Sequence, residues 1–413
     1  MFLLKTTLRL AIFFTFSFIP VLLHGQHQGY IYGDIVLKNK KVYTGQISWG
    51  SGQRLWSDIF WVAKQEHPNL RYLNEYQLDD LPQEPSESAL DWQFMNLWKD
   101  KYPARKTEAL CRFGDISRIH VTGKNTAQVY FKNGFKYRVI ADEDAPGNLA
   151  KELWVLGDKN SYKIPWDQIS SINFKPTPNF LSLLKGNPLY GTMMTSAGTL
   201  SGYIEFGKNK SRDIRYLGGR TKEGENLQIM FKHIRRLEKR DNEMIVKLLS
   251  GKIITLAYIE DFTSGNENIV VMHPSFGKVT VKWKAFRSLS FEKIDENTGY
   301  EHYPTAKKIY GVALTKDKKI FKGNSVFDMD EEFDFELLEG SKDGISYQIP
   351  FRFISRIIPF NVYYSKVVLK NNKTLLLGHH NDVTARNWGM MVWQANSKFQ
   401  YIPWGNLTEL RIR

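Results

Sequence analysis

Residues 161–174 read SYKIPWDQISSINF, and residues 346–360 read SYQIPFRFISRIIPF. Both stretches place an aromatic residue directly after a proline and continue with apolar residues at steps of three. Proline fixes φ and withholds a backbone donor, so a strand is interrupted there. Apolar residues three apart match one turn of 3₁₀ helix. The stretch, which we name the closing phrase, therefore predicts a strand, a single helical turn and a second strand.

The aromatic residue followed by apolar residues at steps of three occurs six times along the chain, and three of these closing phrases carry the preceding proline: Pro165, Pro350 and Pro403. The copies begin at the aromatic residues Phe113, Trp166, Phe231, Trp283, Phe351 and Trp404. The intervals between them are 53, 65, 52, 68 and 53 residues, which alternate between short and long. Periodicity of this kind is typical of repeat proteins. The alternation predicts six units that come in pairs, hence three doublets.

The front of each unit repeats as well. Odd-numbered units open with Tyr32-Gly33, Tyr190-Gly191 and Tyr310-Gly311, and a second glycine follows at Gly45, Gly202 and Gly323. Even-numbered units open with VYFKNGFK, VKLLSGK and VVLKNNK. Alternating apolar runs broken by Asn, Gly and Lys are a hairpin signal. Each unit is therefore predicted to hold about five short strands, with the one-turn helix before the last.

These patterns predict an all-β fold of six small β-barrel-like units arranged as three doublets. A unit of about 50 residues is marginal alone, and closing its sheet removes exposed strand edges. The alternative is a six-bladed β-propeller, whose blades have a similar length. The blades of a propeller are expected at equal intervals along the sequence, so the alternating intervals favour the doublets.

The same patterns set the expected boundaries. They are a signal peptide at 1–25, unit 1 at 26–124 with an insertion at about 66–108, unit 2 at 125–174, a linker at 175–188, unit 3 at 189–241, unit 4 at 242–293, a linker at 294–307, unit 5 at 308–360 and unit 6 at 361–413. Within the insertion, Leu90, Phe94 and Trp98 recur at steps of four and predict a helix. That helix either covers an open barrel edge or forms a partner-binding arm. Apolar residues at 180–184 predict a helical turn in the first linker.

One motif links the units to a known family. Leu37-Lys38-Asn39 leads to Gly45-Gln46-Ile47, and the segment 314–317 leads to Gly323. This arrangement of a polar turn between two strands resembles the Sm-like small β-barrel. The resemblance implies tandem Sm-like repeats in an exported bacterial protein. Sm-like proteins begin with a helix and bind RNA in rings, whereas no helical pattern precedes these units, so the resemblance concerns the fold and not the function.

The N-terminus indicates export. Lys5 and Arg9 precede an apolar run at 10–23, and Gly25 offers a small residue for cleavage. A membrane anchor is the alternative, but the run is short for the roughly 30 Å of a bilayer core. We expect a chain in the periplasm, on the outer envelope surface or outside the cell, without a transmembrane segment after cleavage. Cys111 is the single cysteine, so no intrachain disulfide can form.

Charge suggests the kind of partner. The whole chain carries a net charge of +14, and removal of Lys5 and Arg9 lowers it to +12. A basic exported protein can meet an anionic glycan or an acidic envelope protein; no nucleic acid is expected. Lysines gather on the predicted turns, where they form either a basic stripe or simple solvated tips. They are Lys38, Lys40, Lys41, Lys132, Lys136, Lys316, Lys318, Lys319, Lys370 and Lys373.

The most metal-like cluster is His379-His380-Asn381-Asp382. Adjacent histidines on a strand point to opposite faces, so both cannot readily bind one ion. Three acidic residues precede an asparagine by five positions: Asp382 with Asn387, Asp261 with Asn266, and Glu143 with Asn148. Such loops can hold Ca²⁺ or form turns stabilised by their own side chains. The turn is the favoured interpretation, and no metal or cofactor is assigned.

The sequence contains no motif typical of a catalytic site. Neither G-x-S-x-G nor H-E-x-x-H occurs in the sequence. Cys111, next to a closing phrase, is expected in the core, and the acidic run 328–332 is expected to be a solvated face. No catalytic residue is therefore predicted. The tryptophans that can stack on sugars if exposed are Trp49, Trp56, Trp61, Trp388, Trp393 and Trp404.

Two functions remain open from the sequence. The first is a non-enzymatic envelope protein that binds or scaffolds through its tandem β repeats. The second is a glycan-binding or glycan-active protein that uses exposed aromatics and acidic loop residues. An enzyme concentrates perturbed acids in one pocket, whereas a scaffold spreads its unusual residues over several units.

Overall fold

The computed structural model describes residues 28–50, 52–64, 68–82, 107–141, 149–157, 160–178, 186–207, 209–262, 268–273, 276–293, 299–395 and 398–413. The expected signal peptide, the helix around Phe94 and the helical turn at 180–184 lie outside these residues. The described chain is built of antiparallel strands, so the all-β prediction is confirmed. None of its helices is long and apolar enough to cross a membrane.

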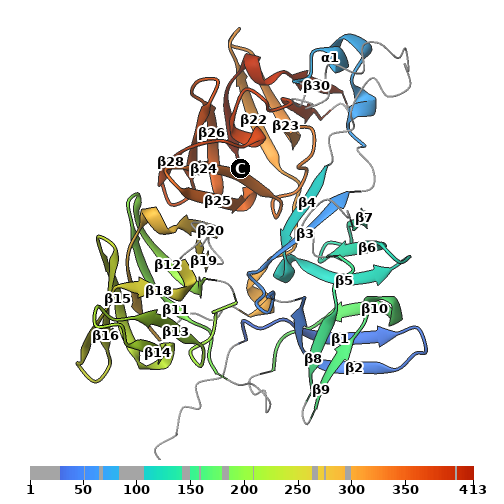
Figure 1. The fold of residues 1–413 in the computed structure, drawn as a ribbon. Coiled ribbons are helices and arrows are strands. Elements are labelled where there is room, and N and C mark those ends of the chain that lie inside the picture. Colours follow the sequence, from blue (N-terminus) through green and yellow to red (C-terminus); the bar gives the residue numbers. More distant parts are fainter. Residues whose placement is uncertain are drawn as a thin grey trace, which may run out of the picture.

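Three groups of strands, which we call the first, second and third module, follow one another along the chain (Figure 1). The first module contains β1 (Tyr32–Leu37), β2 (Val42–Trp49), β3 (Ile59–Lys64), β4 (Glu108–Arg112), β5 (Ile116–Val121), β6 (Thr126–Phe131), β7 (Lys136–Ile140), β8 (Leu153–Leu156), β9 (Ser161–Ile164) and β10 (Ile169–Phe174). These strands form one sheet in the order β9-β8-β2-β1-β10-β5-β6-β7-β3-β4.

The third module has the same order, β30-β29-β23-β22-β31-β26-β27-β28-β24-β25. Its strands are β22 (Tyr310–Thr315), β23 (Ile320–Phe327), β24 (Leu337–Lys342), β25 (Ile345–Pro350), β26 (Ile354–Pro359), β27 (Tyr364–Leu369), β28 (Thr374–Gly378), β29 (Met390–Trp393), β30 (Phe399–Ile402) and β31 (Leu407–Ile412).

The second module follows the order β20-β19-β12-β11-β21-β15-β16-β17, with a separate sheet β18-β13-β14 beside it. Its strands are β11 (Tyr190–Thr195), β12 (Gly198–Phe206), β13 (Tyr216–Arg220), β14 (Asn226–Met230), β15 (Ile234–Arg240), β16 (Glu243–Leu248), β17 (Ile253–Leu256), β18 (Tyr258–Ile259), β19 (Asn268–His273), β20 (Gly277–Lys282) and β21 (Phe286–Phe291).

Strand pairing crosses the boundary between the two units of a doublet. The hairpin β1–β2 pairs with β10 on one side and with β8 on the other, although both belong to the second half of its module. The hairpin β6–β7 pairs in turn with β5 and β3 from the first half. The expected closure of each unit into its own small barrel is therefore wrong, and no sheet in the described residues closes on itself. Strand edges that a single unit would leave unpaired are hydrogen-bonded to strands of the neighbouring unit instead. Nor do the strands form six separate blades.

All six closing phrases contain the predicted one-turn 3₁₀ helix. The turns are η4 (Phe113–Asp115), η5 (Trp166–Gln168), η6 (Phe231–His233), η8 (Trp283–Ala285), η10 (Phe351–Phe353) and η12 (Trp404–Asn406). Each is followed at once by a strand. The leading aromatic ring is buried in five of the turns and half-buried in η8, where Trp283 stacks on Phe286 at 5.2 Å between ring centroids.

The repeated glycines allow close approach between strands. Gly33 lies opposite Gly45, and in the other modules Gly191 lies opposite Gly202 and Gly311 opposite Gly323. A Cβ atom on Gly33 would lie 2.2 Å from the carbonyl oxygen of Asn173, and one on Gly45 would lie 2.1 Å from that of Leu156. Only glycine lets a strand run this close to both neighbours.

The modules pack against each other. Strand β20 of the second module pairs with β25 of the third, and their buried apolar residues form one cluster. The first module has its own core, which also takes in Tyr303 and Ala306 from the linker and Phe333 and Phe335 from the third module. From the insertion, η1 (Leu70–Tyr72) and α1 (Glu75–Asp79) pack on the third module. Three further short turns lie in the described residues: η7 (Glu260–Phe262), η9 (Tyr300–His302) and η11 (Asn381–Val383).

Candidate functional site

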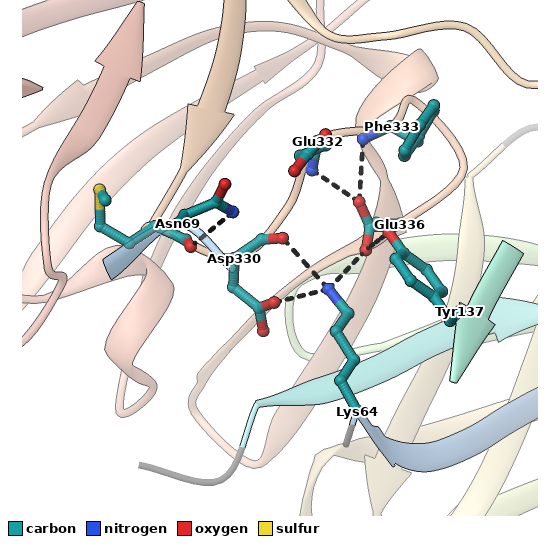
Figure 2. A network of polar contacts seen from close by, with 8 residues as sticks. Lys64, Asn69, Tyr137, Asp330, Glu332, Phe333 and Glu336 are labelled. Carbon is teal, nitrogen blue, oxygen red and sulfur yellow. Dashed lines mark hydrogen bonds and ion pairs between the residues drawn. The ribbon is translucent and has the colours of Figure 1, made fainter. Parts of the chain in front are cut away.

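Buried charges meet where the first module contacts the third (Figure 2). Lys64, the last residue of β3, extends its ammonium group into the loop between β23 and β24. Its Nζ donates to Asp330 Oδ1 at 2.5 Å, to the Asp330 carbonyl oxygen at 3.1 Å and to Glu336 Oε1 at 2.9 Å. All three donor positions of the ammonium group are thus used across the module contact.

Glu336 is the centre of this junction. Its Oε1 also accepts from the Tyr137 hydroxyl at 2.6 Å, while its Oε2 accepts from the backbone N–H groups of Glu332 and Phe333 at 2.7 and 2.9 Å. We call Lys64, Tyr137, Asp330 and Glu336 the lysine junction. Burial disfavours the Lys64 ammonium, but attraction by Asp330 and Glu336 outweighs it and raises the pKa of Lys64. The amine stays protonated and acts as a tie between modules, not as a nucleophile.

A second ionic cluster lies at the same contact. Asp115 in η4 places one carboxylate oxygen 3.1 Å from Arg112 Nε and the other 3.0 Å from Nη1 of Arg352. Arg352 belongs to the third module, and its Nη2 lies 3.0 Å from Asp334 Oδ1. We call these four residues the arginine junction. Arg112 and Asp115 are buried, and removing one partner of a buried ion pair strongly destabilises the fold.

The linker before the third module is fastened to the first. Lys132, at the tip of the hairpin β6–β7, donates to the carbonyl oxygens of Tyr300 and Tyr303 at 2.6 and 2.7 Å. Its Nζ also lies 3.7 Å from the centroid of the Tyr300 ring. Burial lowers the pKa of Lys132 to about 8. The Tyr303 ring covers Gly114 so closely that a Cβ atom there would lie 2.3 Å from it.

The described part of the insertion is a strap from the first module to the third. Asn69 Nδ2 donates to the Met329 carbonyl oxygen at 3.1 Å, and Trp388 Nε1 donates to the Pro82 carbonyl oxygen at 2.9 Å. Asn74 caps α1 in a capping box with Gln77. This helix start was not predicted from the sequence. Modules far apart in sequence are thereby joined at a second place.

The histidine cluster forms a local turn. Asp382 Oδ2 accepts from the Glu339 N–H at 2.6 Å, and Asn387 Nδ2 donates to the Asp382 carbonyl oxygen at 3.1 Å. His380 lies 3.2 Å from Asp382 and 3.4 Å from Glu339, whereas His379 is exposed. The Asp382 carboxylate therefore bonds strand β24, while the side chain of Asn387 stabilises the local turn through the Asp382 backbone.

In the other two loops of that pattern, Asn266, Glu143 and Asn148 lie outside the described residues. Among the residues that are described, no three His, Cys, Asp or Glu side chains are grouped to hold a metal ion.

Cys111 is buried, as expected, and burial raises the pKa of its thiol. The acidic run 328–332 is not a solvated face, because Asp328 is buried and Asp330 is bonded to Lys64. Lys132 is likewise not a free tip. Both errors have one cause: the sequence does not show that another module covers these turns.

The other turn lysines face solvent, apart from the half-buried Lys373. Four of the six tryptophans considered for sugar stacking are buried, namely Trp49, Trp56, Trp388 and Trp404. Trp61 and Trp393 are half-buried. The aromatic residues therefore serve mainly the core and the module contacts.

Sequence reasoning missed the lysine and arginine junctions. Asp115 and Arg352 lie inside closing phrases, and that position next to a repeated aromatic residue was the available signal. Comparison with protein-family models, with curated proteins and with solved structures finds no match to this chain. The site is thus defined by its own geometry: ionic and aromatic contacts that hold the first module against the third and against the linker.

Proposed function

We propose that this chain is an exported, non-enzymatic protein of the bacterial envelope that acts as a scaffold. In this proposal its tandem β repeats form three modules held in fixed relative positions, and partners bind the outer loops and edges. The observation that carries it is the lysine junction, where Lys64 of the first module bonds two acids of the third. The expected partner is an envelope protein or an anionic glycan.

The use of the buried charges supports a scaffold over an enzyme. Catalytic sites gather groups of perturbed pKa where substrate can reach them. Here burial lowers the pKa of Lys64, but attraction by Asp330 and Glu336 outweighs it and raises that pKa, while burial and the charge of Glu336 raise the pKa of Tyr137. Both side chains are nevertheless bonded to residues of another module. Such groups stabilise an arrangement of modules and are not free to exchange protons with a substrate. No catalytic, cofactor-binding or metal-binding residue is assigned.

The test is cross-linking in the native envelope. A tagged full-length chain is cross-linked in intact cells, purified and analysed by mass spectrometry. The proposal expects a mature chain that begins near Gln26 and one or a few partners in constant proportion. A chain that keeps Met1 and stays inside the cell contradicts export, and a chain recovered alone contradicts the scaffold. Retention on heparin that falls with salt would indicate an anionic glycan as partner.

A glycan-binding function is the second candidate, and one surface favours it. Trp154 is 41% exposed on β8, with Lys163 Nζ 6.0 Å from its ring centroid. Affinity electrophoresis in soluble polysaccharides tests this candidate. Trp154→Ala should abolish any retardation, while Tyr216→Ala, a similarly exposed ring on the second module, should not.

A further inference from the structure

The hairpin between β26 and β27 ends in an apolar tip. Phe360, Val362 and Tyr363 are 55%, 58% and 70% exposed, and they fall within four consecutive residues. We call these three residues the aromatic tip. The corresponding turns between β5 and β6 and between β15 and β16 read TGKN (122–125) and DN (241–242), which are polar. Exposed apolar side chains are normal when scattered, but a group of them calls for a partner.

The aromatic tip is held in shape by its backbone. Asn361 Oδ1 accepts from the N–H groups of Tyr363 and Tyr364, both at 2.9 Å. The Val362 carbonyl oxygen accepts from the Ala385 N–H at 2.9 Å, which ties the tip to the following loop. Little backbone entropy is lost when the tip binds, which lowers the free-energy cost of binding.

Cationic side chains lie behind the tip. Lys366 Nζ is 4.7 Å from the centroid of the Phe360 ring. Arg386, next to Ala385, is exposed, as is His379, whose ring lies 5.9 Å from that of Tyr364. Aromatic rings favour the headgroup level of a bilayer, and nearby lysine and arginine side chains reach anionic headgroups.

The shape of the tip also argues for a lipid surface. A stable contact with a folded protein buries about 800 Å² on each side. Three side chains at a convex hairpin end offer far less than that, whereas a bilayer adapts to a small wedge without a complementary pocket. We propose that the aromatic tip inserts into the interface of a membrane rich in anionic phospholipid, with Lys366 and Arg386 contacting the headgroups. This inference stands apart from the scaffold function, because it holds or fails with purified protein and lipid.

The experiment is co-sedimentation of the full chain with vesicles. One set contains phosphatidylglycerol and phosphatidylcholine, and the other contains phosphatidylcholine alone. The parent protein should bind the anionic vesicles, less strongly as salt rises. The variant F360S/V362S/Y363S should lose binding at least about tenfold. The variant K366Q should lose about fivefold, the usual effect of one basic residue near an anionic surface.

A matched control replaces Leu249 and Ile253 by serine. They are 66% and 61% exposed at the hairpin between β16 and β17 of the second module. This variant should bind like the parent, and circular dichroism should show that every variant is folded. Equal binding by the tip variant and the parent would overturn the proposal. So would a parent that ignores vesicles but forms a dimer, in sedimentation velocity, that the tip variant loses, because the tip would then contact a second copy of the chain.

Discussion

Replacement of Lys64 by methionine is the sharpest test of the module contact. The ammonium group makes three hydrogen bonds there, and its side chain is only 6% exposed. Methionine keeps the length of the side chain but leaves the carboxylates of Asp330 and Glu336 enclosed without their cation. Removing one partner of a buried ion pair typically costs about 3–5 kcal/mol. We therefore expect K64M to weaken the contact by about 100-fold to 4,000-fold, at about 1.4 kcal/mol per tenfold.

The assay is urea unfolding followed by tryptophan fluorescence, with amide hydrogen exchange of residues 327–336. A chain of three modules need not unfold in one step, so the first transition is the one to compare. Because the folded-state pKa of Lys64 is raised, its contribution is fully present below about pH 10, the unfolded value, and is lost only above it. The deficit of K64M should therefore be the same at pH 6 and pH 9.

The matched control is Lys163→Met. Lys163 Nζ lies 2.9 Å from Glu152 Oε1, the same distance as in the pair of Lys64 with Glu336, but both side chains are about half exposed. An exposed pair contributes at most about 1 kcal/mol. If K64M and K163M unfold at the same urea concentration and residues 327–336 exchange as in the parent, the lysine junction does not hold the modules together.

Three further predictions follow from single contacts. Gly114→Ala should destabilise the chain by about 1–3 kcal/mol, because its Cβ meets the Tyr303 ring, and limited proteolysis should cut the linker at 299–306 faster; an unchanged digestion pattern contradicts this. Trp166→Ala should lower the free energy of unfolding by about 3–5 kcal/mol, and Trp283→Ala should lower it less, because that ring is half-buried. A larger loss of melting temperature in Trp283→Ala than in Trp166→Ala would contradict this order. Burial, with repulsion from Glu339, raises the pKa of Glu108 to about 7; since the unfolded value is about 4.3, the folded state binds this proton more tightly and stability should fall as pH rises from about 4 to 7. Melts of Glu108→Gln across this range should show a weaker pH dependence, and an identical profile would contradict the assignment.

The local elements could be predicted from the sequence because the residues that determine each of them lie close together in the chain. Pro165 interrupts a strand wherever the rest of the chain lies, and apolar residues at 166, 169 and 172 favour one 3₁₀ turn followed by a strand. The paired glycines, such as Gly33 and Gly45, were visible as a pattern, although their role as partners across a hairpin was not. Elements whose signals span a few residues are the ones that sequence reading recovers best.

The partners of the strands were decided by the tertiary structure. An alternating strand can pair with any amphipathic edge, and nothing in β1–β2 specifies β8 and β10 over its neighbour β3. The expected closed barrels failed for this reason. The two junctions were hidden likewise: Lys64 and Glu336 are 272 residues apart, and each alone is typical of a solvated surface. Burial turned ordinary surface charges into the ties between modules, and burial is a property of the assembled fold and not of any local stretch of sequence.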